Sequence, residues 1–395
     1  GALSDIKAAY DANTAGEITG LGDETITVSD TGSITSSDLN DLNALTTGVV
    51  TVTGATTITG NLADLLISYG SENGIVTGLS DEAITLSDTG SVAASDLNTL
   101  NSKTTGTITV NAATVTGSYS DVNTTYTASG FSGLGDEAIT LSGETTAAQL
   151  NTIAAATTGV VTATISDNDI DTLSDISESG NALSISVTDA SVDASELNAI
   201  NDVTTVAVSV TSTTITGSAS EINTSYAADA AGTISGLGSE NVTLNDTTLA
   251  ASTLNTVDGN TTRAVNAGNV TTLTGEAADL NTAYSSAGIS GLGDEAVTLS
   301  DTSVSSSTLN TLDGNTSGTV NAATVTSLTG TADTASTALS SNGISGIGSA
   351  AVTLTDTSLT ATSLVVLDNK TTGSINAGTV TTITGTAAAS DAVIT

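Results

Sequence analysis

The sequence of 395 residues contains no cysteine, histidine, methionine, proline or tryptophan. Without cysteine there is no disulfide bond, no thiolate nucleophile and no sulfur ligand for a metal ion. Without histidine there is no side chain whose ordinary pKa lies near neutrality. Serine and threonine are abundant, but no histidine or suitably placed lysine is present to activate one of them as a nucleophile. These absences predict that the chain is not an enzyme.

Positive charge is almost as scarce, because 4 lysine and arginine residues face 42 acidic residues and the formal net charge is -38. Phosphate recognition depends on lysine and arginine, so we expect no binding to nucleic acid. No run of 18 apolar residues is present, so we expect no direct insertion into a membrane. The scarcity of tryptic cleavage sites and of oxidisable side chains favours a long-lived material with an extracellular or cell-surface location.

The strongest pattern in the sequence is an internal repeat. The phrase Gly20-Leu-Gly-Asp-Glu-Thr-Ile-Thr-Val-Ser-Asp30 returns with small changes at Gly78, Gly133, Gly236, Gly291 and Gly346. Equivalent apolar positions mark units that start near residues 26, 84, 139, 185, 242, 297 and 352, which are about 55 residues apart. We therefore interpret residues 1–395 as a single continuous repeat array of seven units, with no separate cap domains.

Each unit divides into two halves, and each half contains an apolar residue with an apolar partner three or four positions later. Leu97 with Leu100 is an example from one half, and Leu65 with Tyr69 is an example from the other. These spacings place both side chains on one face of a helical turn. Short alternating runs such as Ile108-Thr-Val-Asn111 separate the turns and are typical of half-buried β-strands.

These patterns predict an all-β fold, a β-solenoid of about fourteen coils with a short helical turn in each coil. A unit of this length cannot bury a core alone, so stacked neighbours have to complete it. The absence of proline agrees with this prediction, because nearly every backbone N–H group would bond to a neighbouring coil. Tandem β-sandwiches, which need about 100 residues each, are the less favoured alternative.

The two ends of the sequence lie in the same type of half-repeat, at Ser4-Asp5-Ile6 and at Ser390-Asp391-Ala392. Neither end shows an atypical capping repeat, and open strand edges favour pairing with a further repeat. We expect the chain either to associate with itself head to tail or to be a segment of a longer array. The sequence leaves both alternatives open.

Two phrases carry a resemblance to known proteins: Leu309-Asn-Thr-Leu-Asp-Gly-Asn-Thr-Ser-Gly-Thr-Val-Asn-Ala322 and Gly291-Leu-Gly-Asp-Glu-Ala-Val-Thr-Leu-Ser300. They resemble repeats in giant repetitive cell-surface and extracellular-matrix proteins of marine cyanobacteria. The resemblance covers essentially the whole chain. It implies a role at the cell surface or in the matrix in seawater, where calcium is plentiful, and it supplies no catalytic residues.

Two sets of acidic residues are candidate calcium sites. An Asp-Glu pair recurs at the same place in four units, as Asp23, Glu24, Asp81, Glu82, Asp136, Glu137, Asp294 and Glu295. Stacking would align these pairs into acidic rows that either bind bridging calcium ions or form a solvated face. A second set has the spacing of a calcium loop and consists of Asp167, Asp169, Asp171, Asp175 and Glu178. Thr172 stands where such a loop has glycine, so this segment is either a calcium site or a degenerate repeat.

Calcium is therefore the candidate cofactor, and we expect no other. We interpret the chain as an extracellular structural repeat protein that forms, or is part of, a fibre or surface layer by end-to-end stacking. The alternative is a calcium-stiffened stalk segment of a large surface adhesin. A third, less favoured reading is a rod that binds ice or surface glycans, suggested by Thr-X-Thr runs such as Thr51-Val-Thr53.

Overall fold

The computed structural model describes residues 1–70 and 76–386. Within this part the protein is α/β, with 34% helix, 27% strand and parallel sheets whose strands are separated by helices. The predicted all-β fold is therefore wrong, and so is the β-solenoid with one short helical turn in each coil. Most of the expected turns are amphipathic helices, up to the 13 residues of α9 (Ala219–Ala231). The half-repeat marker at Ala392 lies outside the described residues.

The chain divides into two compact units, Gly1–Ser186 with Ile200–Val208, and Val187–Ala199 with Ser209–Thr395. The helices of the first unit are α1 (Leu3–Thr14), α2 (Ser36–Leu45), α3 (Leu62–Tyr69), α4 (Ala94–Asn101), α5 (Tyr119–Thr127), α6 (Ala147–Ala154) and α7 (Ile170–Leu173). Those of the second unit are α9, α10 (Ala251–Asn260), α11 (Ala277–Ser285), α12 (Ser306–Asn315), α13 (Ala332–Ser340) and α14 (Ala361–Asp368). The residues of α8 (Ala194–Val203) belong partly to each unit.

The described strands of the first unit form three parallel sheets. The first contains β1 (Ile26–Val28), β3 (Val50–Val52) and β5 (Val76–Thr77) in that order. The second has the order β10 (Phe131–Ser132), β8 (Ile108–Thr109), β6 (Ala83–Leu86), β4 (Thr57–Gly60) and β2 (Ser33–Thr35). The third has the order β13 (Ala182–Ser184), β12 (Val161–Ile165), β11 (Ala138–Thr145), β9 (Thr114–Gly117) and β7 (Ser91–Ala93).

The second unit repeats this arrangement in four parallel sheets. One five-stranded sheet has the order β15 (Ser191–Asp193), β17 (Thr214–Gly217), β19 (Asn241–Leu244), β21 (Val265–Asn266) and β23 (Ile289–Ser290). The other has the order β20 (Thr248–Ala250), β22 (Thr272–Gly275), β24 (Ala296–Leu299), β26 (Val320–Asn321) and β28 (Ile344–Ser345). A four-stranded sheet has the order β25 (Ser303–Ser305), β27 (Ser327–Gly330), β29 (Ala351–Leu354) and β31 (Ile375–Asn376). A two-stranded sheet consists of β30 (Ser358–Thr360) and β32 (Thr382–Thr384). The remaining strands are β14 (Ser186–Val187), β16 (Val208–Val210) and β18 (Ile234–Ser235).

The helices are longer than predicted because a small residue extends the apolar face by one turn. In α2 the buried side chains are Ser36, Leu39 and Leu42, spaced three residues apart. The sequence prediction used the two leucines and missed the serine, whose place is taken by alanine in most equivalent helices. Three buried positions at this spacing form the stripe of an amphipathic helix.

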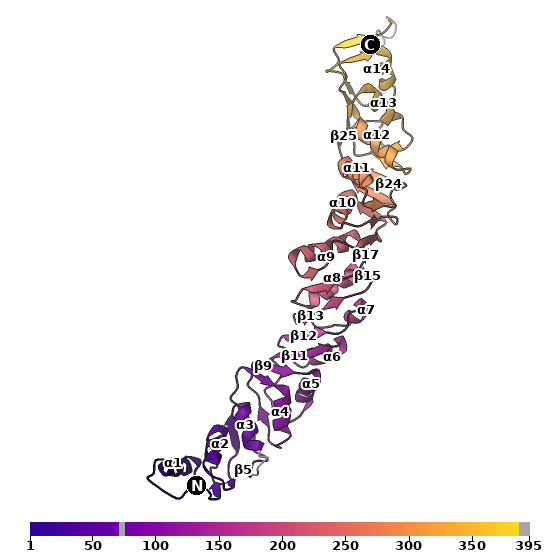
Figure 1. Cartoon of the computed structure of the whole chain (residues 1–395). Helices are drawn as coiled ribbons and strands as arrows, with labels where there is room; N and C mark the ends of the chain where they lie inside the picture. The colour runs from indigo at the N-terminus through magenta and orange to yellow at the C-terminus, as the bar shows by residue number, and fades with distance from the viewer. Residues whose placement is uncertain (71–75, 387–395) are drawn as a thin grey trace. The chain divides into compact units, whose positions relative to one another are not determined.

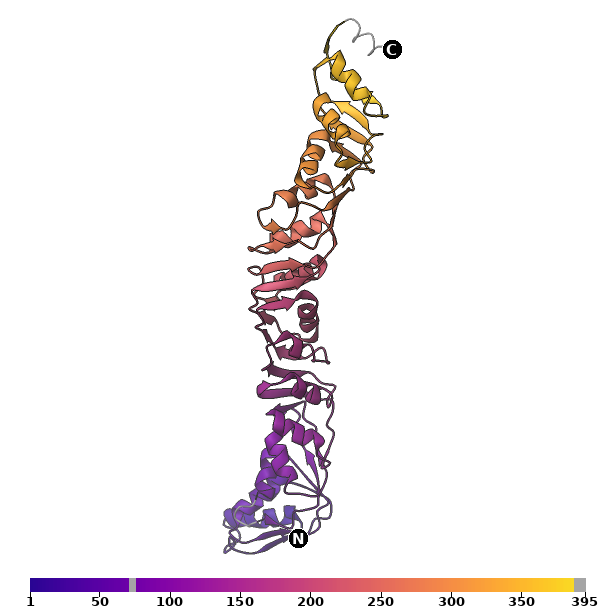
Figure 2. The ribbon, with the colours of Figure 1, turned by 90° about the vertical axis from the view of Figure 1, so that its right-hand side faces the viewer.

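The core of each unit is built from in-register apolar rows. Ile58 pairs with Ile34 on one side and with Ile84 on the other, and Ile84 pairs with Ile108. All four side chains are buried. Successive helices also pack on one another, from α2 to α5 in the first unit and from α10 to α14 in the second (Figure 1, Figure 2). Each repeat therefore completes the core of its neighbours, as expected for repeats that cannot fold alone.

Candidate functional site

Five buried or half-buried tyrosines donate hydrogen bonds to glutamates of the recurring turn. These Tyr–Glu pairs are Tyr10–Glu24, Tyr69–Glu82, Tyr126–Glu137, Tyr226–Glu240 and Tyr284–Glu295, with oxygen–oxygen distances between 2.5 and 3.4 Å. Each tyrosine comes from a helix, and each glutamate lies just before the strand that follows the turn. The pairs therefore connect a helix to the start of the strand that follows the recurring turn.

Glu295 illustrates how such a glutamate accepts hydrogen bonds with both its side chain and its backbone. Its side chain is buried, and its carboxylate accepts hydrogen bonds from the Tyr284 hydroxyl at 2.9 Å and the Gly293 backbone N–H at 2.8 Å. Its backbone carbonyl accepts a hydrogen bond from Thr316 Oγ1 at 2.7 Å. A buried carboxylate is stable only when such donors replace its lost hydration. This glutamate therefore joins three segments of chain.

The environment of the pairs changes the pKa values of their members. Burial, followed by the hydrogen bond to Glu137, raises the pKa of Tyr126 far above its ordinary value. Burial, followed by the hydrogen bond to Glu240, does the same to the pKa of Tyr226. The pKa of Glu24 is lowered, first by the Gly22 backbone N–H that donates to its carboxylate. The fold thus favours the neutral form of the paired tyrosines and the ionised form of Glu24.

The tyrosine and the glutamate are lost together in the two remaining units. The carbonyl groups of Leu183 and Ala350 accept the threonine hydrogen bonds that Glu295 accepts elsewhere, so they occupy the glutamate position. In these units the tyrosine position, four residues after the half-repeat marker, is Ser174 or Leu339. The simplest physical reason is that an unpaired buried carboxylate is costly, so neither partner is useful alone.

The structure separates the predicted Asp-Glu pairs into two environments. The aspartates, Asp23, Asp81, Asp136 and Asp294, are exposed, whereas Glu82, Glu137 and Glu295 are buried and Glu24 is half-buried in the Tyr–Glu pairs. Sequence reasoning missed Glu240, because it follows Ser239 and not an aspartate. The signal that finds it is a tyrosine 11 to 14 residues earlier.

A second recurring carboxylate caps helices of the neighbouring half-repeat. Asp30, Asp88, Asp167, Asp246, Asp301 and Asp356 each accept a hydrogen bond at 2.7 Å from the first backbone N–H group of a helix, at Leu3, Leu62, Ala147, Ala219, Ala277 and Ala332. Such N–H groups have no partner within the helix. Asp167, the first residue of the predicted calcium loop, therefore caps a helix as the other five aspartates do, although α6 belongs to the other type of half-repeat.

The other residues of the predicted calcium loop lie on the surface. Asp169 accepts hydrogen bonds from the backbone N–H groups of Asp171 and Thr172 and caps α7. Asp171, Asp175 and Glu178 are exposed. Over residues 1–70 and 76–386, no group of three or more acidic side chains is arranged to hold a metal ion. Calcium binding stays a prediction.

A third recurring contact explains the asparagine that follows many of the leucine markers. Backbone carbonyls accept hydrogen bonds at 2.7 to 3.0 Å from the Nδ2 groups of Asn40, Asn98, Asn151, Asn198, Asn255 and Asn310. The acceptor lies in the next helix in every case but that of Asn151, whose acceptor Asp175 follows α7. In three cases the Oδ1 atom also accepts a hydroxyl group, from Ser68, Thr125 or Ser225. Apart from Asn151, each asparagine therefore links consecutive helices.

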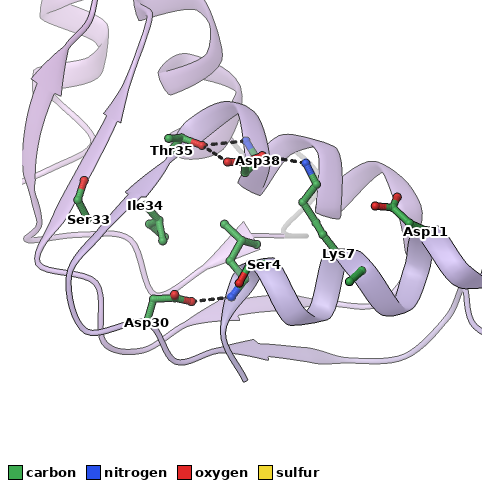
Figure 3. Close-up of a pocket in the computed structure, with 10 residues that line it drawn as sticks. Ser4, Lys7, Asp11, Asp30, Ser33, Ile34, Thr35 and Asp38 are labelled. Carbon is green, nitrogen blue, oxygen red and sulfur yellow. Dashed lines mark hydrogen bonds and ion pairs between the residues drawn. The ribbon is translucent and has the colours of Figure 1, made fainter.

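Figure 3 shows a hollow of about 440 Å³ between α1 and the segment that contains β2. Lys7 Nζ lies 2.8 Å from Asp38 and 3.0 Å from Asp41, and Asp30 caps α1 at its floor. A hollow at the equivalent place in the second unit is lined by Ala332 and Asp356. A hollow at this place thus recurs with the repeat, and in both hollows an aspartate of the lining caps a helix.

No protein-family model, curated protein or solved structure matches the chain. In the part of the chain that the structure describes, no helix is both long enough and apolar enough to cross a membrane. The contacts between repeats are therefore the main basis for a functional proposal.

Proposed function

We propose that the chain is an extracellular structural repeat protein that forms, or is part of, a fibre or surface layer by end-to-end stacking of α/β repeats. One observation carries the proposal: the recurring polar side chains bond to neighbouring segments of the array. The Tyr–Glu pairs, the capping aspartates and the linking asparagines all have this property. Polar groups that recur for stability and not around one cleft are typical of a scaffold.

Composition supports the location outside the cell. The surface is strongly acidic, with a net charge of -38, and such self-repulsion keeps a long-lived array soluble. The four basic residues leave few sites for tryptic proteases. A scaffold in an environment rich in proteases and oxidants benefits from both properties.

A calcium-stiffened stalk segment of a surface adhesin is the second candidate. Asp171, Asp175 and Glu178 are exposed within a short stretch beside α7, and calcium prefers carboxylate and carbonyl oxygens. In this candidate the bound ion, and not the contact between chains, would supply the stiffness.

Electron microscopy of the purified chain, with calcium and then with a chelator, distinguishes the two candidates. Uniform fibres that survive chelation support the structural subunit. Single particles that loosen only in the chelator support the adhesin stalk. Antibody labelling of intact producing cells tests the location, and labelling that requires permeabilised cells would overturn the extracellular assignment.

A further inference from the structure

Two isoleucines are exposed although their repeat equivalents are buried or half-buried. Ile18 is 41% exposed, whereas Ile234, which also precedes a Gly-Leu-Gly turn, is 0% exposed. Ile383 is 48% exposed, whereas Leu328, which also precedes Thr-Gly, is 0% exposed. Within residues 1–70 and 76–386, no strand covers Ile18 or Ile383 in the way that these equivalents are covered.

Strand pairing within the second unit shows what covers such positions. Ile344, an equivalent of Ile18, pairs with Val320 of β26. Leu328, the equivalent of Ile383, pairs with Val352 of β29. In both cases the cover is a parallel strand from the adjacent repeat.

The strands equivalent to β26 and β29 that could cover Ile18 and Ile383 lie at the edges of their sheets. β31 is equivalent to β26 and is the last strand in its sheet order, while β1 is equivalent to β29 and is the first strand in its order. In the register of these pairs, Ile375 of β31 is the residue that would face Ile18, and Ile26 of β1 is the residue that would face Ile383. Each exposed isoleucine thus has its complement at the other sheet edge.

We propose that the edge formed by Ile18–Thr19 and β1 of one copy docks on the edge formed by β31 and β32 of a second copy. Ile18 then lies opposite Ile375, and Ile26 lies opposite Ile383, so the parallel sheets continue from one chain to the next. The contact is heterologous and generates an open chain of subunits. The inference rests on the proposed end-to-end stacking and identifies the residues that perform it.

The first residue of the chain already shows that β1 accepts a strand in this register. The Gly1 amino group donates to the Thr27 carbonyl at 2.9 Å, and the Gly1 carbonyl accepts from the Ser29 N–H at 2.9 Å. Gly60 accepts from the Ser87 N–H in the same way, on the strand that contains Ile84. Gly1 therefore contacts β1 in the same register in which Gly60 contacts the segment Ile84–Ser87.

The test uses two variants that each block one edge, Ile18→Asp and Ile383→Asp. Both sites are exposed, so neither change creates a cavity, and circular dichroism checks the fold. Ile67→Asp, at a 60% exposed position on α3, is the matched control. Sedimentation velocity is measured over a range of protein concentrations at high salt, because screening weakens the repulsion between acidic chains.

The wild-type chain and Ile67→Asp are expected to form species whose mass rises with concentration. Each edge variant alone stays monomeric, because every contact needs one intact edge of each kind. An equimolar mixture of the two variants forms a dimer and nothing larger, since only one complementary contact is left. This pattern identifies a heterologous contact that needs the Ile18 edge of one copy and the Ile383 edge of the other.

Two results would overturn the interface. One is a polymer formed by either edge variant alone, which would leave end-to-end stacking intact but place the contact elsewhere. The other is a wild-type chain that stays monomeric at every concentration and salt level. In that case the antibody labelling of cells still decides the proposed extracellular role separately.

Discussion

The Tyr284 hydroxyl donates a hydrogen bond to Glu295 Oε2 at 2.9 Å, and in the following repeat Leu339 and Ala350 replace both partners. We predict that Tyr284→Phe lowers the free energy of unfolding by about 1–3 kcal/mol, because the buried carboxylate loses a donor. Urea unfolding followed by circular dichroism measures the change. Tyr119→Phe, at the tyrosine outside the five pairs, is the matched control.

A double-mutant cycle separates the pair from its surroundings. Glu295→Gln and the double variant complete the cycle with Tyr284→Phe, and we expect a coupling energy of about 0.5–3 kcal/mol. Additive effects of the two changes would show that the hydrogen bond is not what keeps the two residues together.

The sequence predicted part of this arrangement for a clear physical reason. Large apolar residues at helical spacing, such as Leu97 and Leu100, are visible in a sequence and are fully buried in α4. The fold class was missed because the third buried position of each helix is often alanine or serine, residues that carry little hydrophobic signal. The pattern therefore predicts strands separated by single helical turns, whereas the structure has short strands separated by longer helices.

The candidate site was harder to predict because neighbours in a turn have different surroundings. Asp81 and Glu82 look like one acidic feature, yet Asp81 is exposed and Glu82 is 6% exposed. The partner of Glu82 is Tyr69, which belongs to a different pattern and a different element. Only the folded structure shows that Tyr69 and Glu82 are in contact.

An orphaned acceptor in the second unit predicts a stabilising substitution. Asn255 Oδ1 is buried and has no hydrogen-bond partner, whereas Asn198 Oδ1 accepts the Ser225 hydroxyl at 2.8 Å. The residue equivalent to Ser225 is Ala283, which is buried on α11. We predict that Ala283→Ser raises the free energy of unfolding by about 1 kcal/mol.

The control for this substitution lies on the same helix. Ala278→Ser, at an exposed position, carries the same loss of helix propensity without a new hydrogen bond. Equal effects of Ala283→Ser and Ala278→Ser in urea unfolding would count against the orphaned acceptor.

The raised pKa values of the paired tyrosines predict behaviour at high pH. Burial raises the pKa of Tyr69, and burial together with Glu137 raises that of Tyr126. Stability from these neutral tyrosines is complete below the ordinary pKa of about 10. It is lost as the pH rises through the raised pKa of the folded state.

Absorbance at 295 nm, which detects phenolate, checks this prediction in the Tyr119→Phe variant, where only paired tyrosines remain. We expect phenolate to appear together with the loss of helical circular dichroism. Phenolate that forms near pH 10 in a fully folded chain would contradict the buried pairs.

The lowered pKa of Glu24 predicts a loss of stability in acid. Its carboxylate accepts hydrogen bonds from the Gly22 N–H and the Tyr10 hydroxyl, both at 2.8 Å. The stabilisation is present above the ordinary glutamate pKa of about 4.3 and is lost as the pH falls through the lower pKa of the folded state. Thermal unfolding midpoints of wild type and Glu24→Gln should therefore converge below about pH 4. A constant difference across this range would exclude titration of Glu24 as the cause.

The segment 167–178 allows capping and calcium binding to be separated. Asp167 Oδ2 accepts the Ala147 N–H at 2.7 Å, so we predict that Asp167→Ala costs about 1 kcal/mol of stability even in a chelator. Asp175 and Glu178 are exposed, so the double variant Asp175→Asn/Glu178→Gln should leave stability in the chelator unchanged.

Calcium then provides the decisive comparison for this segment. If the predicted loop binds the ion, calcium raises the unfolding temperature of the wild-type chain, because the ion binds only the folded state. The double variant Asp175→Asn/Glu178→Gln should lose that rise while it keeps its stability in the chelator. An unfolding temperature of the wild-type chain that does not respond to calcium would leave Asp167 as a helix cap and remove the loop as a calcium site.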